Sequence, residues 1–321
     1  MFLNPFKKIK RVDEEVLLPS ERFSFINKES QLQFQDEISH YFKDKPDFKL
    51  DFSQGVIHRG NGIDYGLDNV AQMYHQAGAI EKRNVVKDHF NRLFKGEEEN
   101  RKILKNKTNY SFMKKYVAIR LYPLAYLKTT GKDNLIYKED LEGVLTVLVL
   151  DLPSTVIILQ PEDVAKWEIS EEDLFTLGFK NTFANNSVDV TQEKFDDNAT
   201  LWMIGSDTHL FAGAYIYNLP KYQKLIGKYG TLIAIPHRHM ILAFPINDNA
   251  VISAINQLII ITDGLYKQGP GSISPNIFWY DNKKFINLPY KLDLKEKSIG
   301  FSPPEEFIEI LNQVAEQEKK K

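Results

Sequence analysis

Apolar residues recur along the first part of the chain with two spacings, one typical of helices and one typical of strands. Apolar positions across residues 31–43 follow a helical spacing, so an amphipathic helix is expected there. Ser30 and Gln33 resemble a capping box at its start. Residues 48–52 alternate apolar with charged side chains, which is the period of a half-buried strand.

Helical spacing returns further along the chain, and polar residues mark where helices begin. Asp68 is expected to cap one helix, and Val86 and Phe90 lie on the apolar face of the next. Ser170 is followed by three carboxylates, a pattern that predicts a helix N-terminus. A further, buried helix is expected over residues 250–265, with a strand as the alternative because the segment is rich in isoleucine.

Strand candidates in the second half of the chain come in pairs joined by short polar turns. Three pairs are expected: residues 144–150 with 155–159, 232–235 with 240–244, and 277–280 with 285–288. Apolar, β-branched runs separated by turn residues are typical of antiparallel hairpins. The sequence therefore predicts an α+β fold, with mostly antiparallel sheets built from hairpins and packed helices in two lobes.

Changes in composition divide the chain into four parts. Residues 1–29 read as a mixed-charge N-terminal arm, and residues 30–95 as an N-terminal α+β lobe. Residues 96–110 are polar and charged, which favours a surface connection between lobes. Residues 111–321 form a larger C-terminal α+β lobe.

Three glycines around residue 62 raise the question of a nucleotide-binding loop. Gly60, Gly62 and Gly66 are spaced one residue too widely for the dinucleotide fingerprint, and no β-α-β pattern follows. Asn61 and Gly62 instead favour a type I′ hairpin turn, because both of its central residues must accept a positive φ.

Charge and composition exclude several classes of protein. The chain of 321 residues holds 41 lysines and arginines against 43 aspartates and glutamates, so nucleic acid is not an expected partner. It has no cysteine, which excludes thiolate nucleophiles and disulfides and fits a reducing compartment. We see neither a signal peptide nor an apolar run long enough to span a membrane, and we expect a cytoplasmic protein.

The order of residues between 144 and 238 resembles a known family. An apolar strand ends at Asp151, Trp167 precedes the Ser-Glu-Glu-Asp helix start, and Asn181 lies near the end of that helix. Further along, a strand leads into a turn with Pro236 and Arg238. Over residues 45–290 this order is similar to the YtpQ-like family of uncharacterised bacterial proteins. The resemblance implies a cytoplasmic bacterial protein without an assigned activity.

Histidines at three positions are candidate metal ligands. His237 and His239 are two residues apart, as are Asp207 and His209, and such pairs share a face if they lie on strands. Together they could surround Zn²⁺, since three protein ligands plus water is the usual catalytic arrangement. The alternative is a turn that carries surface imidazoles.

Arg238 lies in the same turn and is a candidate for binding a carboxylate. Its guanidinium can pair bidentately with an acid of this chain or of a ligand, and Asp151 or Glu172 is the expected internal partner. The candidate ligand-binding residues are therefore Asp151, Arg238 and His239. Asn181 is expected to bond backbone groups or to cap its helix.

No set of residues in the sequence matches a known catalytic motif. The G-x-S-x-G nucleophile elbow is missing, and the glycine-rich stretch at 269–271 lacks the ending of a phosphate loop. We therefore expect a non-enzymatic binding or adaptor module, with no cofactor, that recognises a protein or small-molecule ligand. The alternative is a metal-dependent hydrolase that uses His209, His237 and His239.

Overall fold

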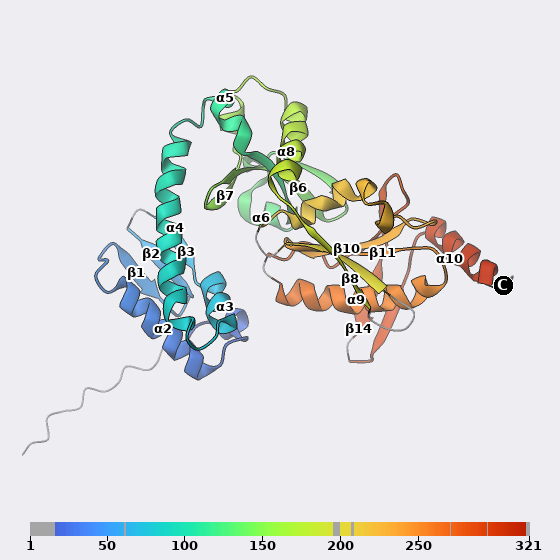
Figure 1. Cartoon of the computed structure of the whole chain (residues 1–321), viewed down its shortest axis with the longest axis horizontal. Coiled ribbons are helices and arrows are strands. Elements are labelled where there is room, and N and C mark those ends of the chain that lie inside the picture. The colour runs from blue at the N-terminus through green and yellow to red at the C-terminus, as the bar shows by residue number, and fades with distance from the viewer. Residues whose placement is uncertain are drawn as a thin grey trace, which may run out of the picture. The chain divides into compact units, whose positions relative to one another are not determined.

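Every described strand pairing is antiparallel, and the sheets are interspersed with helices in an α+β fold (Figure 1). The structure is a computed structural model that describes residues 17–60, 62–194, 200–206, 209–269, 271–293 and 295–318. The chain divides into two units, residues 1–99 and residues 100–321. Each unit has its own apolar core.

The first unit contains a three-stranded sheet in the order β1-β2-β3. Its strands are β1 (Phe48–Asp51), β2 (Val56–Arg59) and β3 (Asp64–Gly66). The β2–β3 hairpin is confirmed, but the predicted type I′ turn is wrong. The Gly62 N–H donates to the Arg59 carbonyl and the Arg59 N–H to the Ile63 carbonyl, so the connection spans three residues and Gly62 closes it with a positive φ of 82°. Asn61, the other central residue of the predicted turn, lies outside the described residues.

Helices surround the core of the first unit. They are α1 (Ser20–Phe23), α2 (Lys28–Phe42), α3 (Asp68–Gln76) and the first part of α4 (Lys82–Leu104). Phe34 and Ile38 of α2 and Phe90 of α4 are buried in one aromatic-rich cluster. The helical spacing in the sequence therefore identifies the buried faces of α2 and α4.

Two of the predicted helix caps are wrong. Helix α2 begins earlier than expected, because the side chain of Asn27 accepts a hydrogen bond from the Ser30 backbone N–H at 2.9 Å. Asp68 lies in the first turn of α3 rather than before it, and its Oδ1 accepts from Arg22 Nε at 2.9 Å. A charge-assisted bond to an arginine is stronger than a neutral cap, so the carboxylate pairs with Arg22.

The described part of the expected N-terminal arm belongs to the core. Leu18, Phe23 and Ile26 are each at most 3% exposed. The prediction of an arm is therefore wrong for residues 17–29, because these apolar side chains find a place against α2 and α3. The basic cluster at residues 7–11 lies outside the described residues.

Helix α4 runs through much of the stretch for which the composition predicts a surface connection. Residues 96–104 are helical, so the predicted connection over 96–110 is wrong for this part. Lysine, arginine and glutamate are strong helix formers, and a single glycine costs only about 1 kcal/mol, so Gly96 does not end the helix. The division between the two units falls between Glu99 and Asn100, inside α4.

The second unit contains a smaller sheet organised around β6. Its strands are β4 (Val117–Pro123), β5 (Tyr137–Leu141), β6 (Val144–Leu152) and β7 (Thr155–Ile158). Strand β4 pairs with one edge of β6 along its length, while β5 and β7 pair with successive parts of the other edge. The predicted hairpin between β6 and β7 is confirmed.

Helix α8 (Glu171–Asn185) covers one face of the smaller sheet. Ser170 caps it as predicted, since its hydroxyl accepts a backbone N–H at 3.1 Å. Gly178 allows the helix to approach closely, because a Cβ there would lie 2.9 Å from Cγ2 of Ile119. The Asn181 amide donates to the Val117 carbonyl at 2.8 Å and ties the helix to β4.

A larger, six-stranded sheet has the order β13-β12-β10-β11-β9-β8. Its strands are β8 (Asp189–Lys194), β9 (Thr200–Gly205), β10 (Thr231–His237), β11 (Met240–Pro245), β12 (Ile277–Tyr280) and β13 (Phe285–Asn287). Helices α9 (Ala250–Gln268) and α10 (Glu305–Glu318) cover one face, and the 3-10 helix η3 (Ala212–Lys221) covers the other. Both predicted hairpins in this sheet are confirmed.

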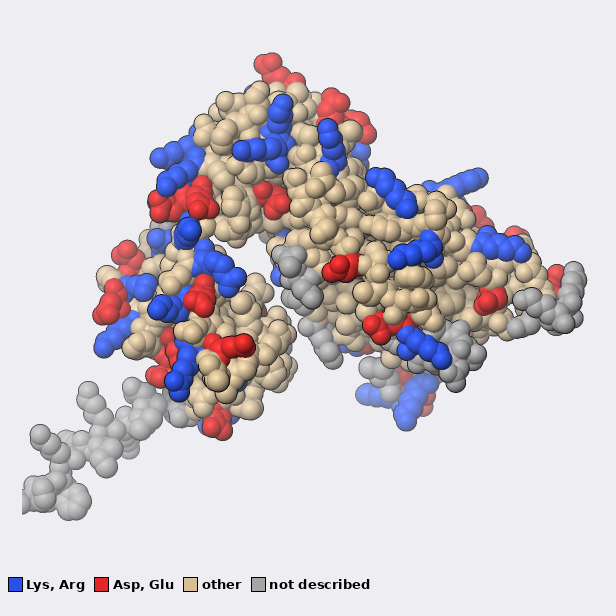
Figure 2. Space-filling model, in the orientation of Figure 1, with Lys and Arg blue, Asp and Glu red and all other residues tan. Residues whose placement is uncertain are grey.

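Short elements complete the second unit. They are α5 (Tyr110–Met113), η1 (Lys114–Tyr116), α6 (Tyr126–Thr130), η2 (Lys132–Asn134), α7 (Pro161–Val164), η4 (Gln223–Leu225) and the hairpin of β14 (Tyr290–Asp293) and β15 (Ser298–Phe301). Among the described residues, no helix is both long enough and apolar enough to cross a membrane. Figure 2 shows acidic and basic side chains interspersed over the visible surface.

Candidate ligand-binding face

Alternate residues of the smaller sheet point away from helix α8 and form its second face. On β4, the side chains on either side of Arg120 face the other way: Ile119 packs under α8 and Leu121 packs toward η3. Arg120 itself stands directly opposite Val147 of β6. Since side chains alternate between the two faces of a strand, the face can be followed across the sheet. We call it the Arg120 face, and it comprises Ala118, Arg120, Tyr122, Leu145, Val147, Val149, Asp151, Val156 and Ile158.

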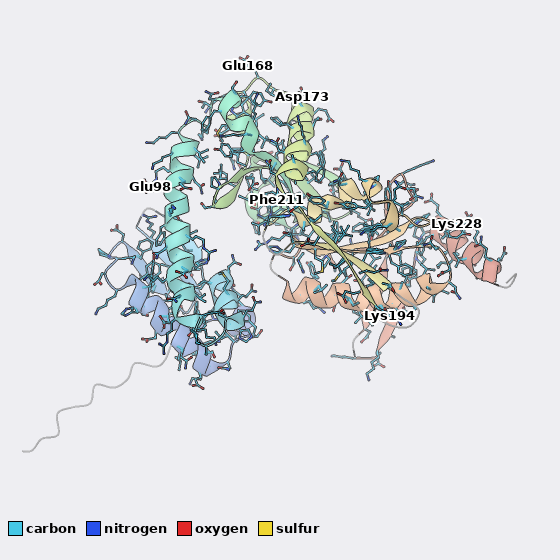
Figure 3. All side chains as sticks on the ribbon, in the orientation of Figure 1. Glu98, Glu168, Asp173, Lys194, Phe211 and Lys228 are labelled. Atoms are coloured by element: carbon cyan, nitrogen blue, oxygen red, sulfur yellow. The ribbon has the colours of Figure 1, made fainter. Side chains whose placement is uncertain are left out.

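Phe211 brings a segment of the chain from the larger sheet onto the Arg120 face. It is 2% exposed and shares an apolar cluster with Val147 and Val149. Figure 3 labels Phe211 near the strands of the smaller sheet. The imidazole of His209 stacks on the Phe211 ring, with the ring centres 6.2 Å apart.

The turn between β10 and β11 lies beside this segment and is held by backbone hydrogen bonds. Arg238 and His239 occupy the turn. The Arg238 N–H donates to the Gly271 carbonyl at 3.1 Å, and the Arg238 carbonyl accepts from the Gly213 N–H at 3.2 Å. The His239 carbonyl accepts from the Ser206 N–H at 3.1 Å. The turn is therefore fixed to three other segments of the chain.

Two glycines leave room for the side chains of the turn. A Cβ at Gly269 would lie 2.3 Å from Cδ2 of His237, and one at Gly271 would lie 2.7 Å from Cδ of Arg238. Gly271 also has a positive φ of 68°, which disfavours any other residue. Gly269 and Gly271 thus support His237 and Arg238 closely, while Pro270 lies outside the described residues.

Two half-buried arginines lie near each other at the Arg120 face without a carboxylate partner among the described residues. Burial lowers the pKa of Arg238, and the nearby charge of Arg120 lowers it further. Arg120 Nε is buried and has no hydrogen-bond partner in the described part of the chain. Its guanidinium carbon lies 4.9 Å from the centre of the Tyr122 ring. The face thus holds an excess of positive charge.

Two tyrosines form the apolar part of the same site. The rings of Tyr122 and Tyr126 stack with their centres 4.5 Å apart. Burial raises the pKa of Tyr122, while the charges of Arg120 and Arg238 act in the opposite direction. Both arginines therefore lie within electrostatic reach of one aromatic side chain.

Asp151 lies on the Arg120 face, but the expected ion pair with Arg238 is wrong. Burial raises the pKa of Asp151, and the charge that opposes this effect is that of His209, not that of Arg238. The other expected partner, Glu172, accepts instead from Lys138 Nζ at 2.8 Å. Of the three candidate ligand-binding residues, Arg238 and His239 are joined by a hydrogen bond, and Asp151 is hydrogen-bonded to neither of them among the described residues.

The imidazoles of His209 and His239 are occupied by hydrogen bonds on both nitrogens. His209 Nε2 donates to the Ser187 carbonyl at 2.5 Å, and its Nδ1 accepts from the Phe211 N–H at 3.1 Å. His239 Nδ1 donates to the Ser206 carbonyl at 3.1 Å, and its Nε2 accepts from Arg238 Nε at 3.1 Å. Neither imidazole has a free lone pair for a metal ion.

His237 is the third candidate metal ligand and is also engaged. It is 6% exposed, and its Nδ1 accepts from the His239 backbone N–H at 3.3 Å. Burial lowers the pKa of His237 to about 4, helped by the charges of His239 and Arg238. The described residues contain no group of three or more histidine, aspartate or glutamate side chains placed to hold a metal. Asp207, the suggested carboxylate ligand, lies outside the described residues.

Sequence reasoning misses three members of this site. Arg120 and Tyr122 lie in a strand that is recognisable by its apolar residues alone, and Tyr126 begins the short helix α6. The sequence feature that could have identified them is Arg120 followed two positions later by Tyr122 in an otherwise apolar strand. It indicates that one face of β4 differs in chemistry from the other.

Comparison of the chain with models of protein families, with curated proteins and with solved structures gives no match. The YtpQ-like resemblance therefore stays a prediction from the order of residues.

Proposed function

We propose that the protein is a non-enzymatic binding module that holds a small-molecule ligand on the Arg120 face. The observation that carries this proposal is the pair Arg120 and Arg238, which have no carboxylate partner among the described residues. A buried N–H without an acceptor and two neighbouring positive charges both cost free energy. A ligand that supplies acceptor oxygens and negative charge would offset both costs.

The tyrosines support a small ligand rather than an ion alone. Pockets for small molecules combine apolar and aromatic surface with a few placed polar groups. Tyr122 and Tyr126 supply the aromatic surface, and the arginines supply the polar groups. Because arginine also stacks on aromatic rings, Arg120 can serve both parts of the site.

Binding fits the site better than catalysis does. A general base needs a free lone pair within reach of the substrate. His209 and His239 use both ring nitrogens within the fold, and His237 is buried. Because these ring nitrogens are already hydrogen-bonded, they are not free to bind a metal. The described residues also contain no group of three or more candidate ligands, so we do not propose a metal-dependent hydrolase.

The proposal can be tested with 3-fluorotyrosine incorporated into the full chain. Fluorine resonances of Tyr122 and Tyr126 are assigned with the variants Tyr122→Phe and Tyr126→Phe, and a library of small metabolites is screened by fluorine NMR. We expect ligands that shift these two resonances and are recovered unchanged. The resonance of Tyr41, which lies in the first unit, serves as the control and should not move.

Two results would contradict the proposal. One is a library whose ligands all leave the Tyr122 and Tyr126 resonances in place. The other is a ligand that binds at these tyrosines and is converted into a product.

We also propose that the protein acts in the cytoplasm and is related to the YtpQ-like family. The absence of cysteine from the sequence supports the first proposal, because such a composition suits a reducing compartment. The order of Asp151, Trp167, Asn181 and Arg238 along the chain supports the second.

A further inference from the structure

We infer that Arg120 and Arg238 together bind the phosphate group of a small phosphate monoester. This inference rests on the proposed binding function of the Arg120 face and names the class of ligand. Four observations carry it: the placement of the two arginines, the rarity of arginine in this unit, the way Arg238 is held, and the adjacent tyrosines.

Arginine is rare in the second unit and is concentrated at this site. Residues 100–321 contain only Arg101, Arg120 and Arg238, while lysine is the common basic residue of the unit. Lysine suffices for solubility and for surface charge. A planar guanidinium is needed where oxygen atoms are bound by two parallel N–H groups, as in carboxylate and phosphate recognition.

Charge favours phosphate over carboxylate. The two guanidinium groups bring two positive charges, and no carboxylate of the described chain neutralises them. A phosphate monoester carries a charge of about −1.5 to −2 near pH 7 and has three strong acceptor oxygens. A carboxylate brings half that charge and fewer acceptors, so it would leave one arginine unpaired.

Arg238 is positioned before any ligand arrives. Its Nε donates to His239 Nε2 at 3.1 Å, and His239 is anchored in turn to the Ser206 carbonyl. Gly271 leaves space for the side chain from the other side. Within the described part of the chain, no acceptor engages the terminal N–H groups of Arg238. A preorganised donor loses less entropy when it binds.

The tyrosines indicate that the phosphate is attached to an organic group. Tyr126 stacks on Tyr122, and the guanidinium of Arg120 lies over the Tyr122 ring. Both tyrosines are only partly buried, so their exposed parts form an aromatic surface beside the arginine. A free phosphate ion would not use this surface, whereas the ring of a phosphate monoester would. We therefore choose phenyl phosphate as the probe and inorganic phosphate and benzoate as its comparisons.

The test is isothermal titration of the full chain with the three probes in low salt. We expect phenyl phosphate to bind at least tenfold more tightly than inorganic phosphate or benzoate. Arg120→Gln and Arg238→Gln should each weaken phenyl phosphate binding at least tenfold, whereas the exposed control Arg101→Gln should leave it unchanged. Tyr122→Ala should remove the advantage of phenyl phosphate over inorganic phosphate.

Two further measurements separate binding from loss of structure. Thermal unfolding shows which variants keep the fold. The variant Arg238→Lys keeps the positive charge but loses the two parallel N–H donors of the guanidinium, so its affinity for phenyl phosphate should lie between those of wild type and Arg238→Gln. Affinity should also fall as the pH is lowered through about 6, because the phosphate takes up a proton there while arginine stays charged.

Several outcomes would overturn the inference. Phenyl phosphate that fails to bind, or that binds folded Arg120→Gln and Arg238→Gln as tightly as wild type, excludes the arginine pair. If inorganic phosphate binds as tightly as phenyl phosphate, the site binds the free phosphate ion rather than a monoester. If benzoate binds as tightly as phenyl phosphate, the site binds carboxylates. If phosphates fail while other ligands still shift the Tyr122 and Tyr126 resonances, the inference is wrong and the proposed binding function stands.

Discussion

At the scale of single residues, the histidines near the β10–β11 turn stabilise the fold in their neutral form. Protonated His239 would lose its ability to accept from Arg238 Nε, and protonated His237 would lose its ability to accept from the His239 N–H. Both imidazoles are therefore coupled to the position of Arg238. A low pH should disturb this turn before it disturbs surface ion pairs of lysine.

His237 gives the sharpest prediction of this kind. Its pKa is lowered to about 4 in the folded protein by burial, whereas an unfolded histidine titrates near about 6.5. The unfolded state then binds the proton first, so stability that is complete above pH 6.5 is lost as the pH falls toward 4. The loss should be on the order of 3 kcal/mol.

Urea unfolding of wild type and His237→Asn at several pH values checks this expectation. Asparagine keeps an acceptor near the position of Nδ1 but does not titrate, so its unfolding free energy should change less between pH 6.5 and pH 4. Parallel curves for the two proteins would show that His237 does not contribute.

At the scale of elements, helix α8 depends on a close approach that only glycine permits. A Cβ at Gly178 would lie 2.9 Å from Cγ2 of Ile119 and 3.2 Å from Cδ2 of Leu148. Gly178→Ala should therefore lower the free energy of unfolding by about 1–3 kcal/mol through overpacking. Thermal or urea unfolding measures the change.

Gly264 of α9 provides the matched control for this substitution. It is also a helical glycine, but a Cβ there would meet nothing within 4 Å beyond its own helix, so Gly264→Ala should stabilise the protein by up to about 1 kcal/mol. If Gly178→Ala and Gly264→Ala change the free energy of unfolding in the same direction, the close packing of α8 on β4 does not explain the effect of Gly178→Ala.

The sequence predicts the elements whose signals are local. Ser170 with its carboxylates marks α8, and the apolar runs around Pro153 mark the β6–β7 hairpin. The charged part of α4 was not predicted, because residues 95–102 carry no apolar side chains that would reveal a helical period, and Gly96 with its polar neighbours resembles a loop. The hairpin of β14 and β15 was also missed, since its strands are only half-buried and carry few apolar residues.

The candidate site could be predicted only in part, for a similar reason. Arg238 and His239 stand out because they occupy a short turn between apolar runs. Arg120 and Tyr122 do not, because their importance arises from tertiary packing: η3 lies against β4, and Gly213 of η3 donates its N–H to the Arg238 carbonyl. Spacing within one strand tells which residues share a face, but not which distant turn lies beside that face.

At the scale of the whole molecule, the proposed binding site and the aromatic cluster around Phe90 lie in different units. All residues of the Arg120 face and of the β10–β11 turn lie within residues 100–321, whereas the aromatic cluster around Phe90 lies within residues 1–99. The two can therefore be perturbed separately.

Phe90→Ala tests this separation. Removing a phenylalanine that is 1% exposed should destabilise the first unit by about 3–5 kcal/mol, visible as faster amide exchange in α2 and α3. Ligand binding at the Arg120 face and amide exchange in β4 and β6 should stay as in wild type. Loss of binding in this variant would show that the second unit does not hold the site by itself.

The most direct measurement of the central claim observes the arginines themselves. Nitrogen-15 spectra of the Nε–H groups can be recorded for the full chain during titration with phenyl phosphate, with assignments from Arg101→Gln, Arg120→Gln and Arg238→Gln. The account predicts that the Arg120 and Arg238 signals shift together along one binding curve while the Arg101 signal stays in place. A titration that leaves both signals unmoved, or that moves Arg101 instead, would contradict it.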